Sequence, residues 1–168
     1  MTRIFTLIFI LLWSSAFITT KPIIDNSDPF SALAFRFFFV SLGFYLFSIF
    51  KKHSLLIRKR NLIESVFSGV LFHGLYLGGV FYSISIGMPT SIAALIVTLQ
   101  PILTNALSGP ILHEKVSTKQ WIGVLLGVGG ASLVLGLDIG SGIPLLGLVA
   151  TIVALLSITI STIWQKRL

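Results

Sequence analysis

The 168-residue chain contains no cysteine, which excludes disulfide bonds, thiolate nucleophiles and cysteine-ligated metal sites. Charged residues are also scarce, at 10% of the sequence against about 25% in soluble domains. Because 55% of the residues are hydrophobic, too few polar side chains remain to cover a surface that faces water. The composition therefore predicts an integral membrane protein.

Acidic residues are rarer than basic ones, with five Asp and Glu against twelve Lys and Arg. Such a surplus can indicate nucleic-acid binding, but here the basic residues lie between apolar runs, as the positive-inside rule describes. No nucleophile–base–acid set and no glycine-rich phosphate loop is visible in the sequence. The sequence thus predicts no enzyme activity, no cofactor, no metal site, no direct use of ATP and no nucleic-acid partner.

Six stretches are long and apolar enough to cross a membrane, since a spanning helix needs about 20 mostly apolar residues. Short segments with Gly, Pro or polar residues separate them. The six stretches are residues 4–21, 30–50, 62–83, 90–110, 120–137 and 144–164. The predicted fold is an all-α integral membrane protein, a bundle of about six transmembrane helices.

The basic residues predict the orientation of these helices, because Lys and Arg concentrate in cytoplasmic loops. Ten of them fall on one side of the membrane: Arg3, Lys51, Lys52, Arg58, Lys59, Arg60, Lys115, Lys119, Lys166 and Arg167. The other side receives Lys21, an interface anchor, together with Asp25, Asp28 and Asp138. We therefore predict a multi-pass protein of the cytoplasmic (inner) membrane with a cytoplasmic N-terminus.

The first 17 residues, MTRIFTLIFILLWSSAF, allow a second interpretation. Their basic start, apolar stretch and small residues Ser14 and Ala16 also resemble a cleavable signal peptide. Removal of this segment would leave the remaining helices on the same sides, so the predicted topology does not depend on the choice.

Small residues recur four positions apart in the third and fifth stretches. Such pairs let helix backbones approach closely where lipid supplies no hydrophobic driving force. The pairs are Ser65 with Gly69, Gly74 with Gly78, and Gly123 with Gly127. They predict a compact bundle.

Two stretches carry information beyond composition. The first is LLWSSAFITTKPIIDNSDPFSALAFRFFF, in which Trp13, Phe17 and Lys21 precede a proline-containing turn and Arg36. The second is TSIAALIVTLQPILTNALSGPILHEKVSTKQWIGVLLGVGGASLVL. It has Pro101 inside its apolar part, then Glu114 at a predicted helix end, then a glycine-rich apolar run. Together they resemble the EamA-type transporters of the drug/metabolite transporter superfamily.

The resemblance implies a first five-helix repeat at residues 1–137, then a linker and the first helix of a second repeat at residues 138–168. EamA-type transporters have ten helices in two inverted repeats, so the implied fold is a partial version of that architecture. Two features depart from the family pattern. Ser14 stands where the family usually has glycine, and the chain stops at Leu168 after six helices.

The implied function is secondary-active transport of small metabolites or drugs across the cytoplasmic membrane, in the export direction, by alternating access between repeats. The expected partners are the lipid bilayer, a small-molecule substrate, and a second copy or a missing C-terminal half. The alternative is a truncated, non-transporting membrane fragment or an accessory membrane subunit, because six helices would leave the path incomplete.

Arg36 lies inside the apolar run PFSALAFRFFFVSLGFYLFSIF, roughly two helical turns after Pro29. A charge at mid-membrane costs about 2.5–3.5 kcal/mol on insertion scales, so such residues usually face a water-filled cavity or a partner. In one interpretation the guanidinium faces a cavity and attracts carboxylate-bearing or other anionic solutes. In the other it reaches the outer interface near Asp28.

His73 lies in the middle of the third stretch, and Tyr76 follows three residues later on the same side of a helix. Because His titrates near neutral pH, His73 is a candidate for proton coupling or substrate binding. The alternative is a neutral histidine hydrogen-bonded between helices. Trp13 is either a wall of the same cavity or a packing residue.

Polar residues also recur along one face of the fourth stretch, at positions i, i+3, i+7 and i+10, with a glutamine beside them. They are Thr98, Pro101, Asn105, Ser108 and Gln100, and we call them the polar stripe. A proline inside a membrane helix frees a backbone carbonyl, which is tolerated where protein or cavity water satisfies it. The stripe lines either the bundle interior or a transport path, and the resemblance favours the path. We predict that Arg36 points into the bundle beside it.

Overall fold

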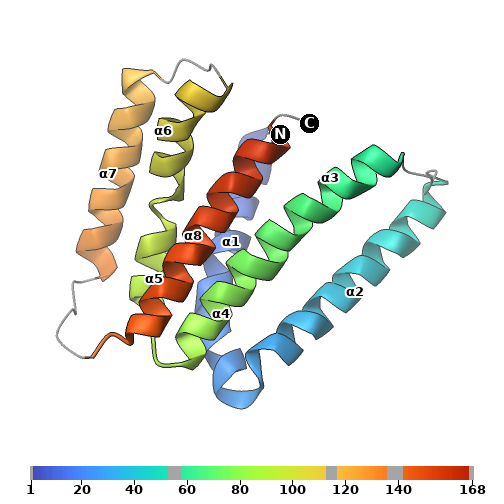
Figure 1. Ribbon diagram of the computed structural model, residues 1–168, viewed down its shortest axis with the longest axis horizontal. Coiled ribbons are helices and arrows are strands. Elements are labelled where there is room, and N and C mark those ends of the chain that lie inside the picture. The colour runs from blue at the N-terminus through green and yellow to red at the C-terminus, as the bar shows by residue number, and fades with distance from the viewer. Residues whose placement is uncertain (1, 53–57, 113–116, 136–141, 167–168) are drawn as a thin grey trace.

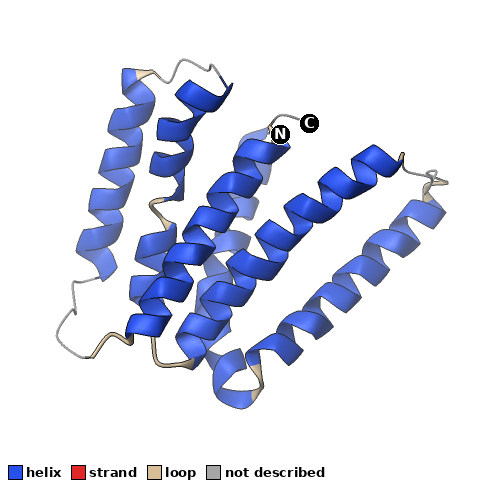
Figure 2. Cartoon of the chain, viewed as in Figure 1, coloured by secondary structure: helices blue, strands red, loops and turns tan. Residues whose placement is uncertain are grey.

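The structure is a computed structural model that describes residues 2–52, 58–112, 117–135 and 142–166. Every regular element in these ranges is a helix (Figure 2). In chain order they are α1 (Thr2–Asn26), α2 (Pro29–Phe50), α3 (Lys59–Gly69), the π-helix η1 (Val70–Leu77), α4 (Gly78–Ser85), α5 (Thr90–Val97), α6 (Gln100–Leu112), α7 (Thr118–Leu135) and α8 (Leu145–Gln165).

These helices correspond to the six predicted stretches. The elements α3, η1 and α4 form one continuous rod, Lys59–Ser85, and α5 with α6 covers the fourth stretch. Five helical segments are long and apolar enough to cross a membrane: Ile4–Asn26, Pro29–Phe50, Lys59–Ser85, Thr90–Gly109 and Leu145–Gln165. The sixth, α7, is an 18-residue helix over the predicted fifth stretch. The predicted all-α membrane fold is confirmed.

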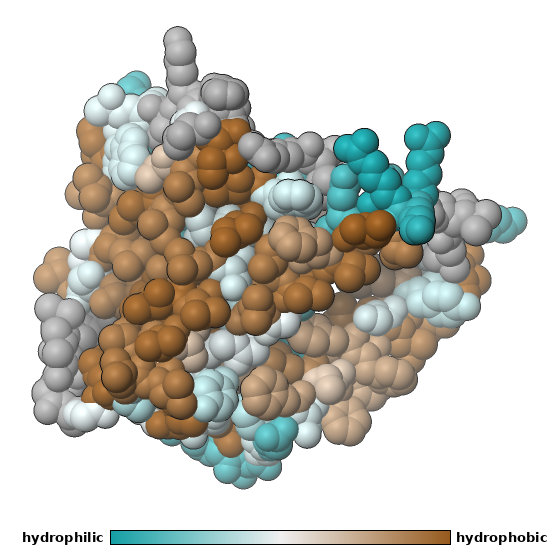
Figure 3. All heavy atoms as spheres, viewed as in Figure 1, coloured by the Kyte–Doolittle hydropathy of each residue, from teal (hydrophilic) through white to brown (hydrophobic). Residues whose placement is uncertain are grey.

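Successive long helices run in opposite directions, so the start of α1 and the end of α8 are at the same end of the bundle (Figure 1). On the face shown in Figure 3, hydrophobic atoms cover the middle and hydrophilic atoms gather at the two ends. Many large apolar side chains on the outside are exposed, including Phe38, Phe39 and Phe44 on α2. Exposed apolar side chains suit a helix bundle in a bilayer. Lipid tails are themselves apolar, so there is no hydrophobic drive to bury these side chains between helices.

Helix α8 lies at the centre of the described helices and packs against the α3–η1–α4 rod, α5 and α6 (Figure 1). A buried apolar cluster joins α8 to the rod and to α5. Its members are Tyr76, Val80, Ile84, Met88, Ala93, Val97, Ala154 and Ile158. The buried core of the described helices is therefore formed mainly by the rod, α5 and α8.

The closest helix approach involves glycines other than those predicted. A Cβ on Gly79 of α4 would lie 3.0 Å from the Ala150 carbonyl oxygen and 3.1 Å from the Ala154 Cβ on α8. By contrast, a Cβ on Gly69, Gly123 or Gly127 would have no neighbour within 4 Å among the described residues, and those on Gly74 and Gly78 would make ordinary contacts. Of the predicted glycines, Gly78 is buried and would contact Phe30 of α2, whereas Gly69, Gly123 and Gly127 do not serve as packing sites between the described helices. A four-residue spacing also occurs on faces that meet lipid.

Asp28 caps the N-terminus of α2. Its Oδ2 accepts a hydrogen bond from the Ser31 backbone N–H at 2.8 Å, and Pro29 follows in the first turn, where its missing N–H costs no bond. These hydrogen bonds from Ser31 hold the pKa of Asp28 below its ordinary value of 3.8, so the cap stabilises α2 above that pH and is lost as the pH falls further. The Asp28 carboxylate thus caps α2 and forms no ion pair with Arg36 in the described structure.

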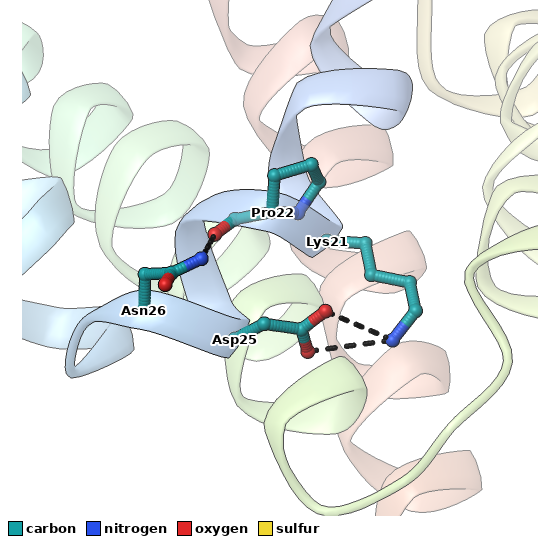
Figure 4. Close-up of polar contacts among 4 residues, drawn as sticks. All are labelled: Lys21, Pro22, Asp25 and Asn26. Carbon is teal, nitrogen blue, oxygen red and sulfur yellow. Dashed lines mark hydrogen bonds and ion pairs between the residues drawn. The ribbon is translucent and has the colours of Figure 1, made fainter.

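Helix α1 extends five residues beyond the predicted end at residue 21, through Pro22 to Asn26 (Figure 4). In this last turn the Lys21 ammonium pairs with Asp25 at 3.2 Å, and the Asn26 side-chain amide donates to the Pro22 carbonyl at 2.8 Å. The apolar run ends at Lys21 because the side chains become polar, but polar i,i+4 pairs can continue a helix. The prediction marked the edge of the hydrophobic region and not the end of the helix.

The fourth span is broken where the sequence predicts a continuous helix with Pro101 in the middle. Helix α5 ends at Val97 and α6 begins at Gln100, with a tighter turn between them in which the Leu99 N–H donates to the Ile96 carbonyl at 3.0 Å. Pro101 is therefore the second residue of α6, a position where its missing N–H has no helical partner to lose. Pro101 starts a helix and does not interrupt one.

The third span contains an eight-residue π-helical segment, Val70–Leu77, which periodicity alone did not predict. A π-helix pairs each N–H with the carbonyl five residues earlier, and such segments are rare and are often found at functional sites. This one carries His73 and Tyr76.

Candidate functional site

A cavity of about 690 Å³ lies between α1, α2 and the α3–η1–α4 rod. Figure 3 shows the surface hollowed where α2 faces α3. Most side chains that line the cavity are apolar, and its volume is within the range of about 300–1,000 Å³ typical of small-molecule sites. It is the candidate functional site.

Aromatic rings form a connected wall along the cavity. Trp13 of α1 lies 5.6 Å from Phe9 and 6.4 Å from Phe72 of η1, measured between ring centroids. Phe72 lies 5.6 Å from Tyr76 and 5.1 Å from His73, and Phe37 of α2 contacts the other side of His73 at 5.1 Å. Most of these ring pairs are edge-to-face, the arrangement that aromatic quadrupoles favour.

Arg36 of α2 is the one permanently charged side chain among the described residues that line the cavity. The acids in the described ranges are engaged elsewhere: Asp25 with Lys21, Asp28 with the Ser31 N–H, and Glu64 with Arg60 at 2.9 Å. No ion pair or hydrogen bond joins the Arg36 guanidinium to any of the described residues. The cavity therefore has an unpaired positive charge in an aromatic wall.

Four of the nine predicted site residues meet at this cavity: Trp13, Arg36, His73 and Tyr76. They come from three helices and are brought together by the packing of α1 and α2 against the rod. Neutral polar groups there are few, the hydroxyls of Thr20 and Ser41 being two of them. The roles of these residues as a substrate pathway remain a prediction.

The polar stripe lies elsewhere. None of its five residues lines this cavity, and α6 packs mainly on α8. The Gln100 Nε2 donates to the Thr104 hydroxyl at 3.1 Å and to the Thr162 hydroxyl of α8 at 3.3 Å, while the Thr98 hydroxyl, just after α5, donates to the Ala94 carbonyl of that helix. Ser108 is almost fully buried, Asn105 is half-buried and Pro101 is exposed.

The predicted position of Arg36 beside the polar stripe is therefore wrong, although Arg36 does face a cavity. Helical periodicity identifies residues that share a face, but it does not identify the neighbour that this face contacts. Within the described structure, α6 packs on α8, and Gln100 of the stripe donates to the Thr162 hydroxyl there. Whether the stripe forms part of a transport path is still a prediction.

Sequence reasoning missed a second polar contact, between α3 and α8. The hydroxyls of Ser68 and Ser161 are 3.0 Å apart and both side chains are buried. Gln165 donates to the Ser68 hydroxyl at 2.6 Å, which closes the cluster. The small polar residues of α8 at four-residue spacing were the available signal, since such residues often hydrogen-bond across membrane helices. This cluster holds α8 to the rod on the side away from α6.

The aromatic wall has a signal in the sequence as well. Phe9 with Trp13, and Phe72 with Tyr76, are four residues apart, which places each pair on one helix face.

In the part of the chain that the structure describes, no group of three His, Cys, Asp or Glu side chains could hold a metal ion.

Comparison with known proteins agrees with the fold and the motifs. Residues 2–136 match the EamA-like transporter family. The chain is 24% identical, over 98% of its length, to an Escherichia coli protein named "Probable amino-acid metabolite efflux pump". It is 23% identical, over 96% of its length, to a Salmonella typhimurium protein of the same name.

A Synechocystis protein described as an uncharacterized transporter is 25% identical over 73% of the chain and 37% of its own length. The matches cover 53% and 52% of the two enterobacterial proteins, so the chain spans about half the length of these curated relatives. No solved structure matches the chain. Because the family match covers most of its residues, the chain belongs to the EamA-like transporter family.

Proposed function

We propose that this protein takes part in secondary-active transport of small metabolites or drugs, in the export direction, by alternating access across the cytoplasmic membrane. The observation that carries the proposal is the cavity of about 690 Å³ with Arg36, His73, Tyr76 and Trp13 in its wall. Family membership supports transport, and the names of the enterobacterial relatives support efflux.

Alternating access needs two bundles or repeats that move against each other around a site. The described helices form one bundle around α8, and the chain matches about half of its curated relatives. We therefore propose that the transporting unit contains a second copy of the chain or a C-terminal half. The second candidate function, an accessory membrane subunit or non-transporting fragment, rests on the same half-length match.

A counterflow experiment separates the two. The protein is reconstituted in liposomes loaded with unlabelled 4-methylpentanoate, leucine or isoamylamine, and entry of the same labelled compound is measured against protein-free liposomes. Transport predicts transient accumulation of at least one compound. Folded, monodisperse protein that gives no accumulation of any of them would favour the accessory subunit.

The orientation is tested by cysteine labelling, which needs no removal of native cysteines because the chain has none. We expect residues 51–61 and 113–119 to be cytoplasmic and residues 25–28 and 138–142 to face outward. In intact cells, an impermeant maleimide should label Ser27→Cys and should label Asn61→Cys only after lysis; both positions are exposed at helix ends. The reverse pattern would invert the proposed topology.

A further inference from the structure

We infer that the cavity between α1, α2 and the α3–η1–α4 rod binds small apolar carboxylic acids and selects them over zwitterions and cations. The inference rests on the proposed transport function, in which the cavity is the substrate site. The inference names a more specific substrate class, apolar carboxylic acids, than the amino-acid metabolites in the names of the enterobacterial relatives.

The charge of the site provides the first argument. Arg36 lines the cavity without a carboxylate partner, because the acids in the described ranges are paired or capped elsewhere. Arg36 is exposed to this open, mostly apolar cavity and has no protein carboxylate to neutralise it, so a ligand carboxylate would supply the missing partner. The planar guanidinium can donate two parallel hydrogen bonds to a carboxylate, a geometry that a halide or an alcohol cannot match.

The wall provides the second argument. Rings of Phe9, Trp13, Phe37 and Phe72 surround the space beside Arg36 and offer apolar surface to the rest of a ligand. Burial of an apolar tail against such rings stabilises a complex in proportion to the area removed from water. The fitting ligand thus has one carboxylate and one apolar tail.

The lack of a negative group in the described lining argues against two other ligand classes. The ammonium of an amino acid would lose its water and meet no carboxylate among the described lining residues; the acceptors there are the hydroxyls of Thr20 and Tyr76 and the His73 ring, which are weaker partners for a cation. Aromatic faces do attract cations, but the positive charge of Arg36 opposes a cation in the same space. An amino acid without its amino group should therefore bind better than the amino acid itself.

Trp13 provides the measurement. The chain has three tryptophans, and Trp13 is the one in the cavity wall. The other two, Trp121 and Trp164, are replaced by Phe. The Trp164 indole N–H is buried without a hydrogen-bond partner, so its loss breaks no hydrogen bond. Fluorescence of Trp13 in nanodiscs is then titrated with 4-methylpentanoate, leucine, isoamylamine and 4-methylpentan-1-ol, which share a branched apolar tail.

We expect saturable binding of 4-methylpentanoate at least about tenfold tighter than that of leucine or isoamylamine, as a charge-assisted bidentate pair predicts. Arg36→Leu should remove this preference; saturable binding of the alcohol by this variant, at whatever affinity, would show that the cavity is still formed. Equal or tighter binding of leucine or of the amine would overturn the inference, as would carboxylate binding that survives Arg36→Leu. The absence of any saturable signal would overturn it too.

The two proposals fail in different ways. If the acid binds selectively but is not carried in counterflow, the carboxylate site stands and the transport proposal fails. If counterflow carries leucine or the amine and is insensitive to 4-methylpentanoate, transport stands and the proposed selectivity is wrong.

Discussion

Replacing Arg36 by leucine is expected to reduce counterflow to the level of protein-free liposomes, while the protein still inserts and folds. Insertion should be favoured, because leucine replaces a charge that costs about 2.5–3.5 kcal/mol at mid-helix. Transport should be lost because Arg36 is the one permanent charge in the described cavity wall. Arg36→Lys should keep part of the activity, since lysine retains the charge but cannot form the planar bidentate contact.

The matched control is Arg58→Leu. Arg58 lies at the exposed start of α3, outside the cavity, in a basic cluster whose other members preserve the charge of that end. This variant should transport as the unmodified protein does. An Arg36→Leu protein with normal counterflow would instead identify Arg36 as an anchor at the membrane interface, and the apolar run around it would be an ordinary span with a basic side chain near one end.

Replacing Gly79 by leucine is expected to prevent α4 and α8 from packing, with little folded protein recovered in mild detergent. A Cβ at this position would lie 3.0 Å from the backbone oxygen of Ala150, and no side-chain rotation can relieve a contact with backbone. Overpacking of a core costs about 1–3 kcal/mol for small additions, which is the effect expected for Gly79→Ala. Leucine adds three further carbons to the same contact, and its effect should exceed that range.

The measurement is the fraction of monodisperse protein after extraction, together with the midpoint of unfolding in increasing dodecyl sulfate. Gly43→Leu on α2 is the control, because a Cβ there would meet nothing within 4 Å in the described structure. It adds the same side chain to a helix without crowding a neighbour. If Gly79→Leu and Gly43→Leu unfold at the same point, the close approach of α4 to α8 does not limit stability.

The positions of the helices were predictable because the thickness of the membrane fixes the length of an apolar run. The same physics explains the error at the end of α1: the uninterrupted apolar run ends at Lys21, while Asp25 and Asn26 continue the helix with side-chain contacts. Trp13, Arg36, His73 and Tyr76 could be selected as site residues because each is costly or unusual in an apolar span. The cavity that joins them follows from packing, which the sequence does not display.

Features that depend on a neighbouring helix were not predictable. The polar stripe was predicted on one continuous helix, but Thr98 lies in the turn after α5 and the other four residues lie on α6. Its Gln100 contacts Thr162 of α8 and not Arg36. In the same way, Gly79 and not Gly74 or Gly78 provides the close approach, because only the helix opposite decides which small residue matters. The tight turn before Gln100 depends on backbone hydrogen bonds that the apolar pattern leaves unspecified.

The wide winding of Val70–Leu77 has a consequence for how the length of this chain can change in evolution. In a regular α-helix, loss of one residue rotates everything beyond it by about 100°, which turns buried side chains toward lipid. A π segment already contains more residues than its turns require, so loss of one residue there can be absorbed by a return to α-helical winding. The same one-residue deletion in α4, next to Gly79, would rotate the end of the helix that contacts α8. We therefore expect the loss of one residue within Val70–Leu77 to be less damaging than the loss of one residue in α4.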